Sequence, residues 1–297
     1  MYLRNFPYLL IFCFSNLVSA QNWYEVSGIN PEFKQTEFKI AKKQLSIASY
    51  HYLKNKNTPP KKTIITVHGY LVNCHYLLPI HEYLLERDFE IFCVELPGLG
   101  QSEGPRAQIA DFKNYQEFIN QLPLISSADY LLVHSTGAVG VIENIIDDIK
   151  MPYEKVFLVT PLVRNYHYTL SKFAFYLGKT FIDSVPRTQA KTYPNKILNS
   201  IHANDPYWIN ATPVSWVDKL IKWNNRLEKK SLVSANDKFR VFYSENDTVV
   251  ETSYNQGFLE KLIPKSKHHL LTSGTHYPFF DPEVSKEFFK YLDQYLK

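Results

Sequence analysis

Apolar residues gather in five short runs along the chain, with longer amphipathic stretches between them. The runs cover residues 63–67, 89–94, 130–133, 155–159 and 239–243. Each run is too short for a helix and too continuously apolar for a strand that has one face in water. Such runs are typical of strands that are buried on both faces of a parallel sheet.

Helical patterns occupy the stretches between these runs. The last one begins with Asp281 as an expected N-cap and Pro282 in the first turn, and its apolar residues then recur on one helical face. Alternating apolar residues in 37–54 indicate an antiparallel hairpin ahead of the first run. We therefore expect an α/β fold, a mostly parallel twisted sheet with helices on both faces, with helices over residues 75–87, 109–122, 140–149 and 281–296.

The alternation of strands and helices is interrupted between Pro161 and Asp237. This segment is longer than an ordinary crossover and holds two helical patterns, 168–182 and 213–228, joined by a proline-containing loop. We interpret it as an inserted helical cap that carries substrate selectivity. The expected organisation is a core in two parts, residues 21–160 and 238–297, and a cap over 161–237.

The first 20 residues resemble a secretory leader. One positive charge precedes an apolar stretch, and small residues end at Ala20, where cleavage is expected. The apolar stretch is shorter than the roughly 20 residues that a membrane-spanning helix requires. We therefore expect export to the periplasm or the medium.

Charge and cysteine content narrow the class of protein further. The formal net charge is +4 and the lysines are scattered, so the sequence does not favour a nucleic-acid partner. Cys74 and Cys93 remain after leader removal. Export would permit a bridge between them, but Cys93 lies inside an apolar run, and a buried small hydrophobic side chain is the favoured interpretation.

A serine interrupts the apolar stretch that begins with the third strand-like run. Ser135 follows that run, and Gly137 and Ala138 open the next helical pattern. This arrangement is typical of a nucleophile elbow, the tight strand-to-helix turn that exposes a serine at the carboxyl end of a strand. Val133 stands where the G-x-S-x-G pattern has its first glycine, so an ordinary turn stays open as an alternative. His134 and Gly137 are expected to support the turn.

A serine hydroxyl needs a base and an orienting carboxylate to become a nucleophile. Asp247 follows the fifth run, and His276 follows a glycine in a loop just before the last helix, which is the order serine, acid, histidine. Glu245 is the alternative acid. His268 and His269 are less favoured bases because both lie inside a strand-like stretch.

The first apolar run ends in His68 and Gly69. We expect the backbone N–H groups of Tyr70 and Thr136 to bind the oxyanion, with His68 and Gly69 supporting this loop. Metal binding by His68, His75 and His81 is not favoured because carboxylate or cysteine ligands at ligand spacing are missing. No cofactor motif occurs, so no cofactor is expected.

These motifs together resemble the α/β-hydrolase superfamily, with closest similarity to its monoacylglycerol lipase, lysophospholipase and serine aminopeptidase-like branch. The similarity runs from about Ser46 to the C-terminus. Its most specific element is ELPGLGQSEG, residues 95–104, in which Glu95 replaces the usual aspartate. Asp205 with Pro206, and the helix around Trp216, resemble the cap of the lipase branch. The resemblance implies the same triad, Ser135, Asp247 and His276, and the same oxyanion donors.

The expected function is hydrolysis of carboxylic esters through an acyl-enzyme, with a lipid-like acyl ester as the small-molecule partner. An apolar stripe in the first cap helix can either cover an acyl chain or pack onto the core; it consists of Leu170, Phe173, Ala174, Leu177 and Phe181. Transient contact of the cap with a membrane surface is a further hypothesis. A serine aminopeptidase and a catalytically silent binding protein on the same scaffold remain as alternatives.

Overall fold

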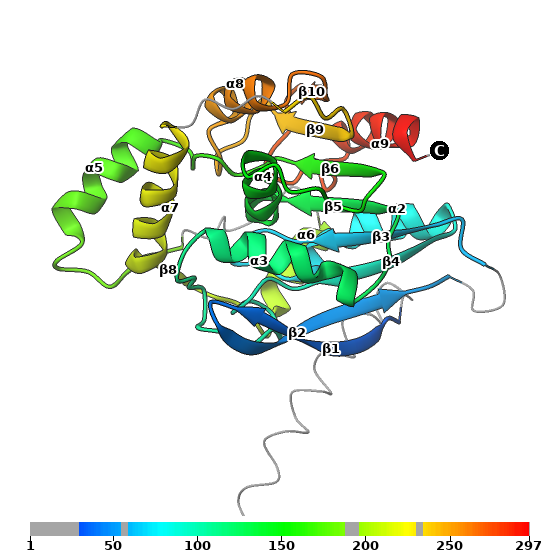
Figure 1. Ribbon diagram of the computed structural model, residues 1–297, viewed down its shortest axis with the longest axis horizontal. Coiled ribbons are helices and arrows are strands. Elements are labelled where there is room, and N and C mark those ends of the chain that lie inside the picture. Colours follow the sequence, from blue (N-terminus) through cyan, green and yellow to red (C-terminus); the bar gives the residue numbers. More distant parts are fainter. Residues whose placement is uncertain (1–29, 55–58, 188–195, 230–233, 297) are drawn as a thin grey trace, which may run out of the picture.

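An eight-stranded mixed sheet forms the centre of the protein (Figure 1). The computed structural model describes residues 30–54, 59–187, 196–229 and 234–296. The expected leader lies outside these residues. The strand order is β1-β2-β4-β3-β5-β6-β9-β10. Their bounds are β1 Glu32–Ile40, β2 Lys43–Tyr52, β3 Lys62–Val67, β4 Phe89–Val94, β5 Tyr130–His134, β6 Lys155–Val159, β9 Phe239–Ser244 and β10 Lys267–Leu271.

The sheet is parallel from β4 to β10, and only the first two strands run antiparallel to their neighbours. β1 and β2 form the hairpin expected from the alternation, and the turn between them places Ala41 and Lys42 at φ values of 50° and 65°. The expected fold class, a mostly parallel sheet with helices on both faces, is therefore confirmed.

Successive side chains of the central strands point to opposite faces of the sheet and pack into two separate cores. Ile65, Leu131 and Leu158 pack into the core that contains α3 (Lys113–Gln121), α4 (Ala138–Ile146) and α8 (Thr252–Leu262). Ile64, Leu132 and Phe157 pack into the core on the other face, with α2 (Leu78–Glu86) and α9 (Val284–Tyr295). Both faces are thus covered, which explains why these strands read as continuous apolar runs.

Helix starts differ slightly from the sequence expectation. α9 begins at Val284, later than expected, because Asp281 Oδ1 accepts hydrogen bonds from the N–H groups of Glu283 and Val284 across the preceding turn. Short 3₁₀ segments precede or follow three helices: η1 (Cys74–Leu77), η2 (Leu122–Leu124) and η3 (Ser135–Gly137).

The two longest helices of the segment between β6 and β9 lie beyond the carboxyl ends of the parallel strands (Figure 1). The segment contains α5 (Tyr168–Gly178), α6 (Lys196–Asn204) and α7 (Val214–Leu227), together with a two-stranded ribbon of β7 (Ser184–Pro186) and β8 (Ala211–Pro213). The sequence patterns indicated two of these three helices but neither α6 nor the ribbon. We refer to this segment as the cap.

The prediction for the two cysteines was wrong. Cys74 and Cys93 form a disulfide, with their Cα atoms 5.9 Å apart. Both residues are fully buried, as the apolar run predicted for Cys93. Burial and bridging coexist because Cys74, at the start of η1, lies within bonding distance of Cys93 in β4.

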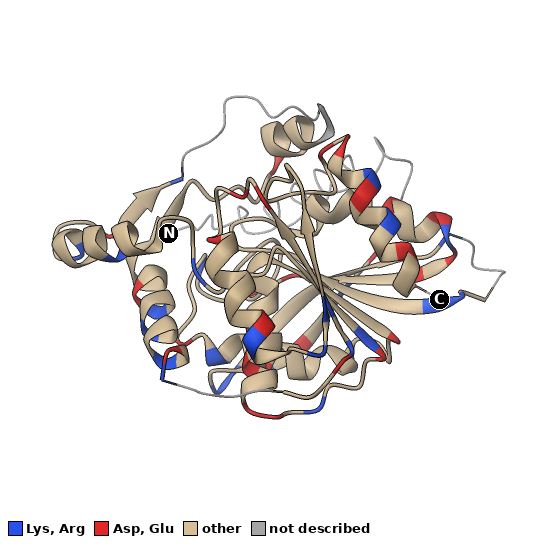
Figure 2. Cartoon of the chain, turned by 90° about the horizontal axis from the view of Figure 1, so that it is seen from above, with Lys and Arg blue, Asp and Glu red and all other residues tan. Residues whose placement is uncertain are grey.

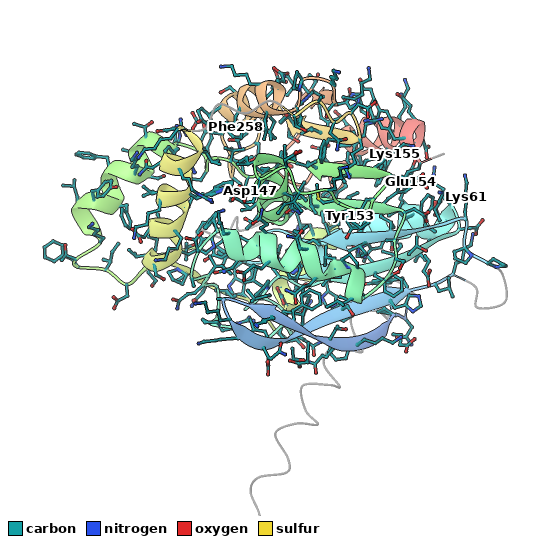
Figure 3. All side chains as sticks on the ribbon, viewed as in Figure 1. Lys61, Asp147, Tyr153, Glu154, Lys155 and Phe258 are labelled. Atoms are coloured by element: carbon teal, nitrogen blue, oxygen red, sulfur yellow. A yellow bond between two sulfur atoms is a disulfide. The ribbon has the colours of Figure 1, made fainter. Side chains whose placement is uncertain are left out.

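Lys and Arg residues, as well as Asp and Glu residues, are spread over many elements rather than collected in one part of the fold (Figure 2). Side chains of α5 stand out from the body of the protein, whereas the labelled Glu154 and Lys155 lie at the opposite end of the sheet (Figure 3). None of the helices within the described residues is both long and apolar enough to cross a membrane.

Candidate active site

Ser135 sits at the turn between β5 and α4. Its φ is 52°, in the left-handed region that non-glycine residues seldom adopt. Gly137 lies directly against the end of β3, where an added Cβ would stand 2.9 Å from the His68 carbonyl oxygen. Val133 is fully buried in the core. The turn thus has the sharp geometry of a nucleophile elbow although its first glycine is missing.

The structure brings the three expected side chains together from three distant loops. His276 Nε2 lies 3.0 Å from Ser135 Oγ, and His276 Nδ1 lies 2.7 Å from Asp247 Oδ2. Each residue follows a strand of the parallel sheet, β5, β9 or β10, and carboxyl ends of parallel strands share one edge. The chain Ser–His–Asp therefore has the geometry that activates a hydroxyl.

Backbone groups hold the acid and the base in place. Asp247 Oδ1 accepts hydrogen bonds from the N–H groups of Val249 and Val250, at 2.7 and 2.9 Å. The His276 carbonyl accepts from His134 Nε2 at 3.0 Å and from the Thr160 hydroxyl at 3.1 Å. Thr160 was missed by the sequence analysis because it merely follows an apolar run.

The alternative residues have other partners. The Glu245 carboxylate is exposed and accepts the N–H of Ser273 at 3.0 Å. His268 lies 2.9 Å from the Tyr243 hydroxyl, and His269 lies 2.8 Å from the Tyr295 hydroxyl. None of these three side chains is near enough to replace a member of the Ser135–His276–Asp247 chain.

The Gly69–Tyr70 peptide lies beside the Ser135 hydroxyl. A Cβ added at Gly69 would stand 2.9 Å from Ser135 Cβ and 3.4 Å from Ser135 Oγ, so only glycine fits here. His68 Nδ1 donates to the Gly69 carbonyl at 2.7 Å, and His68 Nε2 accepts from the N–H of Leu96 at 3.2 Å. Because C=O and N–H point in opposite directions in a trans peptide, this bond orients the Tyr70 N–H.

His68 can do this only in its neutral form. Its Nε2 acts as an acceptor, which requires the proton on Nδ1. Burial lowers the pKa of His68 to about 4, so the ring is neutral at physiological pH. His68 therefore supports the loop, and because both of its ring nitrogens bond backbone groups, neither is placed to take the Ser135 proton.

His75 and His81 lie in other surroundings. His75 Nδ1 lies 2.8 Å from Asn73 Oδ1, and His81 Nε2 lies 2.9 Å from the Thr66 hydroxyl. Burial lowers the pKa of His75 to about 4 and that of His81 to about 3. Within the described ranges no group of three or more His, Cys, Asp or Glu residues is arranged to hold a metal ion.

Glu95 lies behind this loop with its carboxyl group fully buried. It accepts from the N–H of Gln101 at 2.5 Å and from that of Cys74 at 3.5 Å. Burial raises the pKa of Glu95 to about 8. Gly100 has a φ of 51°, and a Cβ there would stand 2.0 Å from the Glu95 carboxylate. The Glu95 side chain, which is longer than the usual aspartate, therefore occupies space that only a glycine at position 100 leaves free.

A cavity of about 1010 Å³ connects Ser135 and His276 to the underside of the cap. The apolar stripe expected in the first cap helix mostly faces away from it. Only Ala174 of the stripe lines the cavity, while Leu170, Phe173, Leu177 and Phe181 are 66%, 64%, 63% and 86% exposed. Neither interpretation of the stripe holds for these four side chains: they neither cover the cavity nor pack onto the core, because α5 packs on α7 with its other side and leaves its outer side in solvent.

Comparisons with known proteins agree with this fold. The family model described as "Serine aminopeptidase, S33" matches residues 58–283. No curated protein matches the sequence significantly. Residues 58–283 contain all the strands from β3 to β10 and the cap, which lie within the region where the sequence resembles α/β-hydrolases.

Solved structures show the same fold at low sequence identity. The monoacylglycerol lipase of Paleococcus ferrophilus is 16% identical, with a TM-score of 0.65 and coverage of 89% of this chain and 98% of that chain. A soluble variant of the monoglyceride lipase of Saccharomyces cerevisiae, in complex with a substrate analog, is 14% identical, with a TM-score of 0.70 and coverage of 90% and 95%. Given the extent of the family match, this chain belongs to the serine aminopeptidase S33 family of α/β-hydrolases.

Proposed function

We propose that this hydrolase cleaves carboxylic esters with Ser135 as nucleophile. The observation that carries the proposal is the continuous chain of contacts from Ser135 Oγ through His276 to Asp247, at 3.0 and 2.7 Å. The strained φ of Ser135 supports it, because such strain collects at functional sites. Serine, rather than aspartate, at the elbow implies an acyl-enzyme intermediate.

Each part of the site has a role in this scheme. His276 takes the Ser135 proton during attack on the carbonyl carbon, and Asp247 holds the imidazole with its proton on Nδ1. The backbone N–H groups of Tyr70 and Thr136 bind the oxyanion. His276 then returns the proton to the leaving alcohol, and water attacks the acyl-enzyme by the same route.

The carboxylates of the cap favour an ester over a peptide with a free ammonium group. Asp205 accepts from Asn73, and Asp218 pairs with Lys222 at 2.7 Å. Asp183 is exposed and does not line the cavity. Asp281 does line it, but one of its oxygens is occupied by the turn before α9. An aminopeptidase would need an acid at the cavity to hold the substrate ammonium; none of these three cap carboxylates lines it, and Asp281, which lies outside the cap, offers only its second oxygen.

The substrate proposed is a lipid-like acyl ester. The cavity is lined largely by apolar side chains of the cap and core, among them Leu162, Phe175, Ile182 and Leu220. Two of the structural neighbours are lipases by name. A largely apolar cavity suits an acyl chain better than a polar peptide.

Replacement of Ser135 tests the proposal directly. Ser135→Ala is expected to lower hydrolysis of p-nitrophenyl esters by about a thousandfold or more while the protein stays folded. Ser215→Ala, which changes an exposed cap serine, is the matched control and should keep full activity. Faster cleavage of aminoacyl anilides than of esters by the unmodified enzyme would favour the aminopeptidase.

A fluorophosphonate probe separates the proposed enzyme from a silent binding protein on the same scaffold. The probe reacts only with an activated serine and should label the unmodified protein but not Ser135→Ala. Folded protein that stays unlabelled would favour the binding protein.

We further propose that the outer side of the cap touches lipid surfaces transiently. Leu170, Phe173, Leu177 and Phe181 are exposed apolar side chains of one cap segment, and the next residue, Ile182, is half exposed and lines the cavity. Leu177→Asp with Phe181→Asp should weaken binding to phosphatidylcholine vesicles about tenfold and leave hydrolysis of soluble esters unchanged. Leu124→Asp, on an equally exposed leucine outside the cap, is the control.

We also propose that the protein is exported. The leader-like N-terminus and the Cys74–Cys93 disulfide support this, because disulfides persist in oxidising compartments. Intact-mass measurement of the native protein should show loss of residues 1–20 and no free thiol in the remaining chain. A full-length, reduced chain would contradict export.

A further inference from the structure

The loop that bears the Tyr70 N–H is held from outside by the cap. We name residues 69–76 the oxyanion loop. Three cap residues, Arg187, Asp205 and Trp216, contact it at separate points. None of them belongs to the Ser–His–Asp chain, and only Arg187 and Trp216 line the cavity.

Arg187 binds the middle of the oxyanion loop. Its Nη1 donates to the Leu71 carbonyl at 2.7 Å, and Leu71 has a φ of 58°, a strained conformation that needs external support. The guanidinium is itself held over the Trp208 ring at 4.0 Å. The Arg187 N–H bonds the Asn210 carbonyl at 2.8 Å, which ties it to the cap ribbon.

Asp205 binds the end of the oxyanion loop. One carboxylate oxygen accepts from Asn73 Nδ2 at 2.9 Å, and the other accepts from the Tyr76 hydroxyl at 3.3 Å. The backbone N–H of Tyr207 also donates to Asp205 at 2.9 Å. The carboxylate thus joins the segment between α6 and β8 to two points on the oxyanion loop.

Trp216 binds the start of the oxyanion loop. Its indole stacks on the Tyr70 ring with centroids 3.9 Å apart and planes 11° from parallel. Trp216 Nε1 donates to the Tyr115 hydroxyl of α3 at 3.0 Å, so the indole is fixed on both sides. The Tyr70 hydroxyl donates to the Ala107 carbonyl at 2.7 Å.

We propose that Arg187, Asp205 and Trp216 are positioning residues through which the cap sets the place of the Tyr70 N–H. The inference rests on the proposed function, since it assigns this N–H to the oxyanion. A displacement of about 1 Å in such a donor lowers catalysis by up to about a hundredfold. The cap therefore acts on the chemistry as well as on substrate choice, although none of the three side chains takes part in the proposed chemistry.

Arg187→Met tests the central contact. It removes the bond to the Leu71 carbonyl while keeping the apolar stem, and we expect about a tenfold lower kcat on a short, neutral, soluble ester with KM changed less than twofold. Arg187→Lys should recover part of the loss. Lys172→Met is the matched control, because Lys172 bonds Asn225 within the cap and does not touch the loop.

Asp205→Asn tests the end of the loop with nearly unchanged shape, and a smaller loss of kcat, roughly threefold, is expected. Hydrogen exchange of residues 69–76 supplies a readout that does not depend on activity. Exchange there should quicken in Arg187→Met and Asp205→Asn and stay unchanged in Lys172→Met.

The possible outcomes separate this inference from the proposed function. If fluorophosphonate labels the unmodified enzyme but both variants keep their kcat and their exchange rates, the positioning role is overturned. A rise of KM confined to anionic esters in Arg187→Met would make Arg187 a substrate-binding residue and would also overturn it. An unlabelled Ser135 in the folded, unmodified protein would instead sink the proposed function.

Discussion

The two halves of the active site are held in different ways. Asp247 and His276 are fixed by bonds from backbone groups or neighbouring residues at the carboxyl edge of the sheet. The oxyanion loop has the sheet on one side, through His68, and the cap on the other, through Arg187 and Asp205. The order of the parallel strands is thus enough to bring Ser135, Asp247 and His276 together, whereas residues 69–76 are also contacted by an insertion.

This difference has a physical origin. Side chains at the ends of buried parallel strands inherit the rigidity of the core, where Val133 and Val159 have no exposed surface. A loop has no such neighbours by itself and needs bonds from another layer to hold a strained residue such as Leu71. Substitutions in the cap should thus affect the oxyanion half and spare the triad half.

The largest effect is expected from a change in the sheet-held half. Asp247→Asn removes the carboxylate that selects the imidazole tautomer and should lower kcat by about ten-thousandfold. Glu245→Gln, two residues away on an exposed side chain, is the control and should change kcat little. Equal losses in the two variants would contradict the assignment of Asp247. Ester-hydrolysis kinetics measure both.

A smaller effect is expected where the two halves meet. In Gly69→Ala the new methyl group would stand 2.9 Å from Ser135 Cβ, so the oxyanion peptide must shift. We expect kcat to fall by about a hundredfold to a thousandfold, as for loss of one oxyanion donor.

Gly257→Ala controls for the change of residue type. Gly257 lies in α8, where an added Cβ would have no atom within 4 Å apart from those of its own helix backbone and chain neighbours, and alanine there should raise stability by up to about 1 kcal/mol. Full activity in Gly69→Ala would mean that the peptide is not placed for catalysis. Steady-state kinetics measure kcat, and urea unfolding measures the free energy of unfolding of both variants.

The smallest effect concerns stability behind the oxyanion loop. The pKa of Glu95 is raised to about 8 from 4.5, so the folded state keeps its proton where the unfolded chain has lost it. The contribution of Glu95 to the free energy of unfolding therefore falls as pH rises between about 5 and 8.

Glu95→Gln removes this titration and isolates it from other groups. The buried histidines are common to both proteins, so their contributions cancel in the difference. The unmodified protein should lose at least about 1.4 kcal/mol relative to Glu95→Gln across this range, the equivalent of one pKa unit. Denaturant unfolding at several pH values measures the difference, and parallel pH profiles would contradict a raised pKa.

Much of the fold was accessible from local patterns. Five apolar runs correspond to β3, β4, β5, β6 and β9, because burial on both faces leaves a continuous apolar signature. The turn at Ser135 could be predicted from the small residues between a strand and a helix. Its partners were found by their order and by their positions after strands, which parallel strands must bring to one edge.

The contents of the cap were less accessible. α6 and the β7–β8 ribbon lie among prolines and short elements, where periodicity carries little information. The exposed stripe on α5 has the spacing of a core-facing helix, so only its surroundings distinguish the two. Arg187 and Thr160 carry no motif, because their roles come from contacts with residues more than 100 positions away in sequence.

Residue type and spacing were sufficient to assign the α/β fold and to name the serine, acid and histidine, since these follow from burial periodicity and from chain order. Only the folded chain shows three other features: the Cys74–Cys93 bridge, the exposed face of α5, and the contacts of the cap with residues 69–76. Each of these depends on which distant surfaces come together, and a local pattern contains no information about the partner that it will meet.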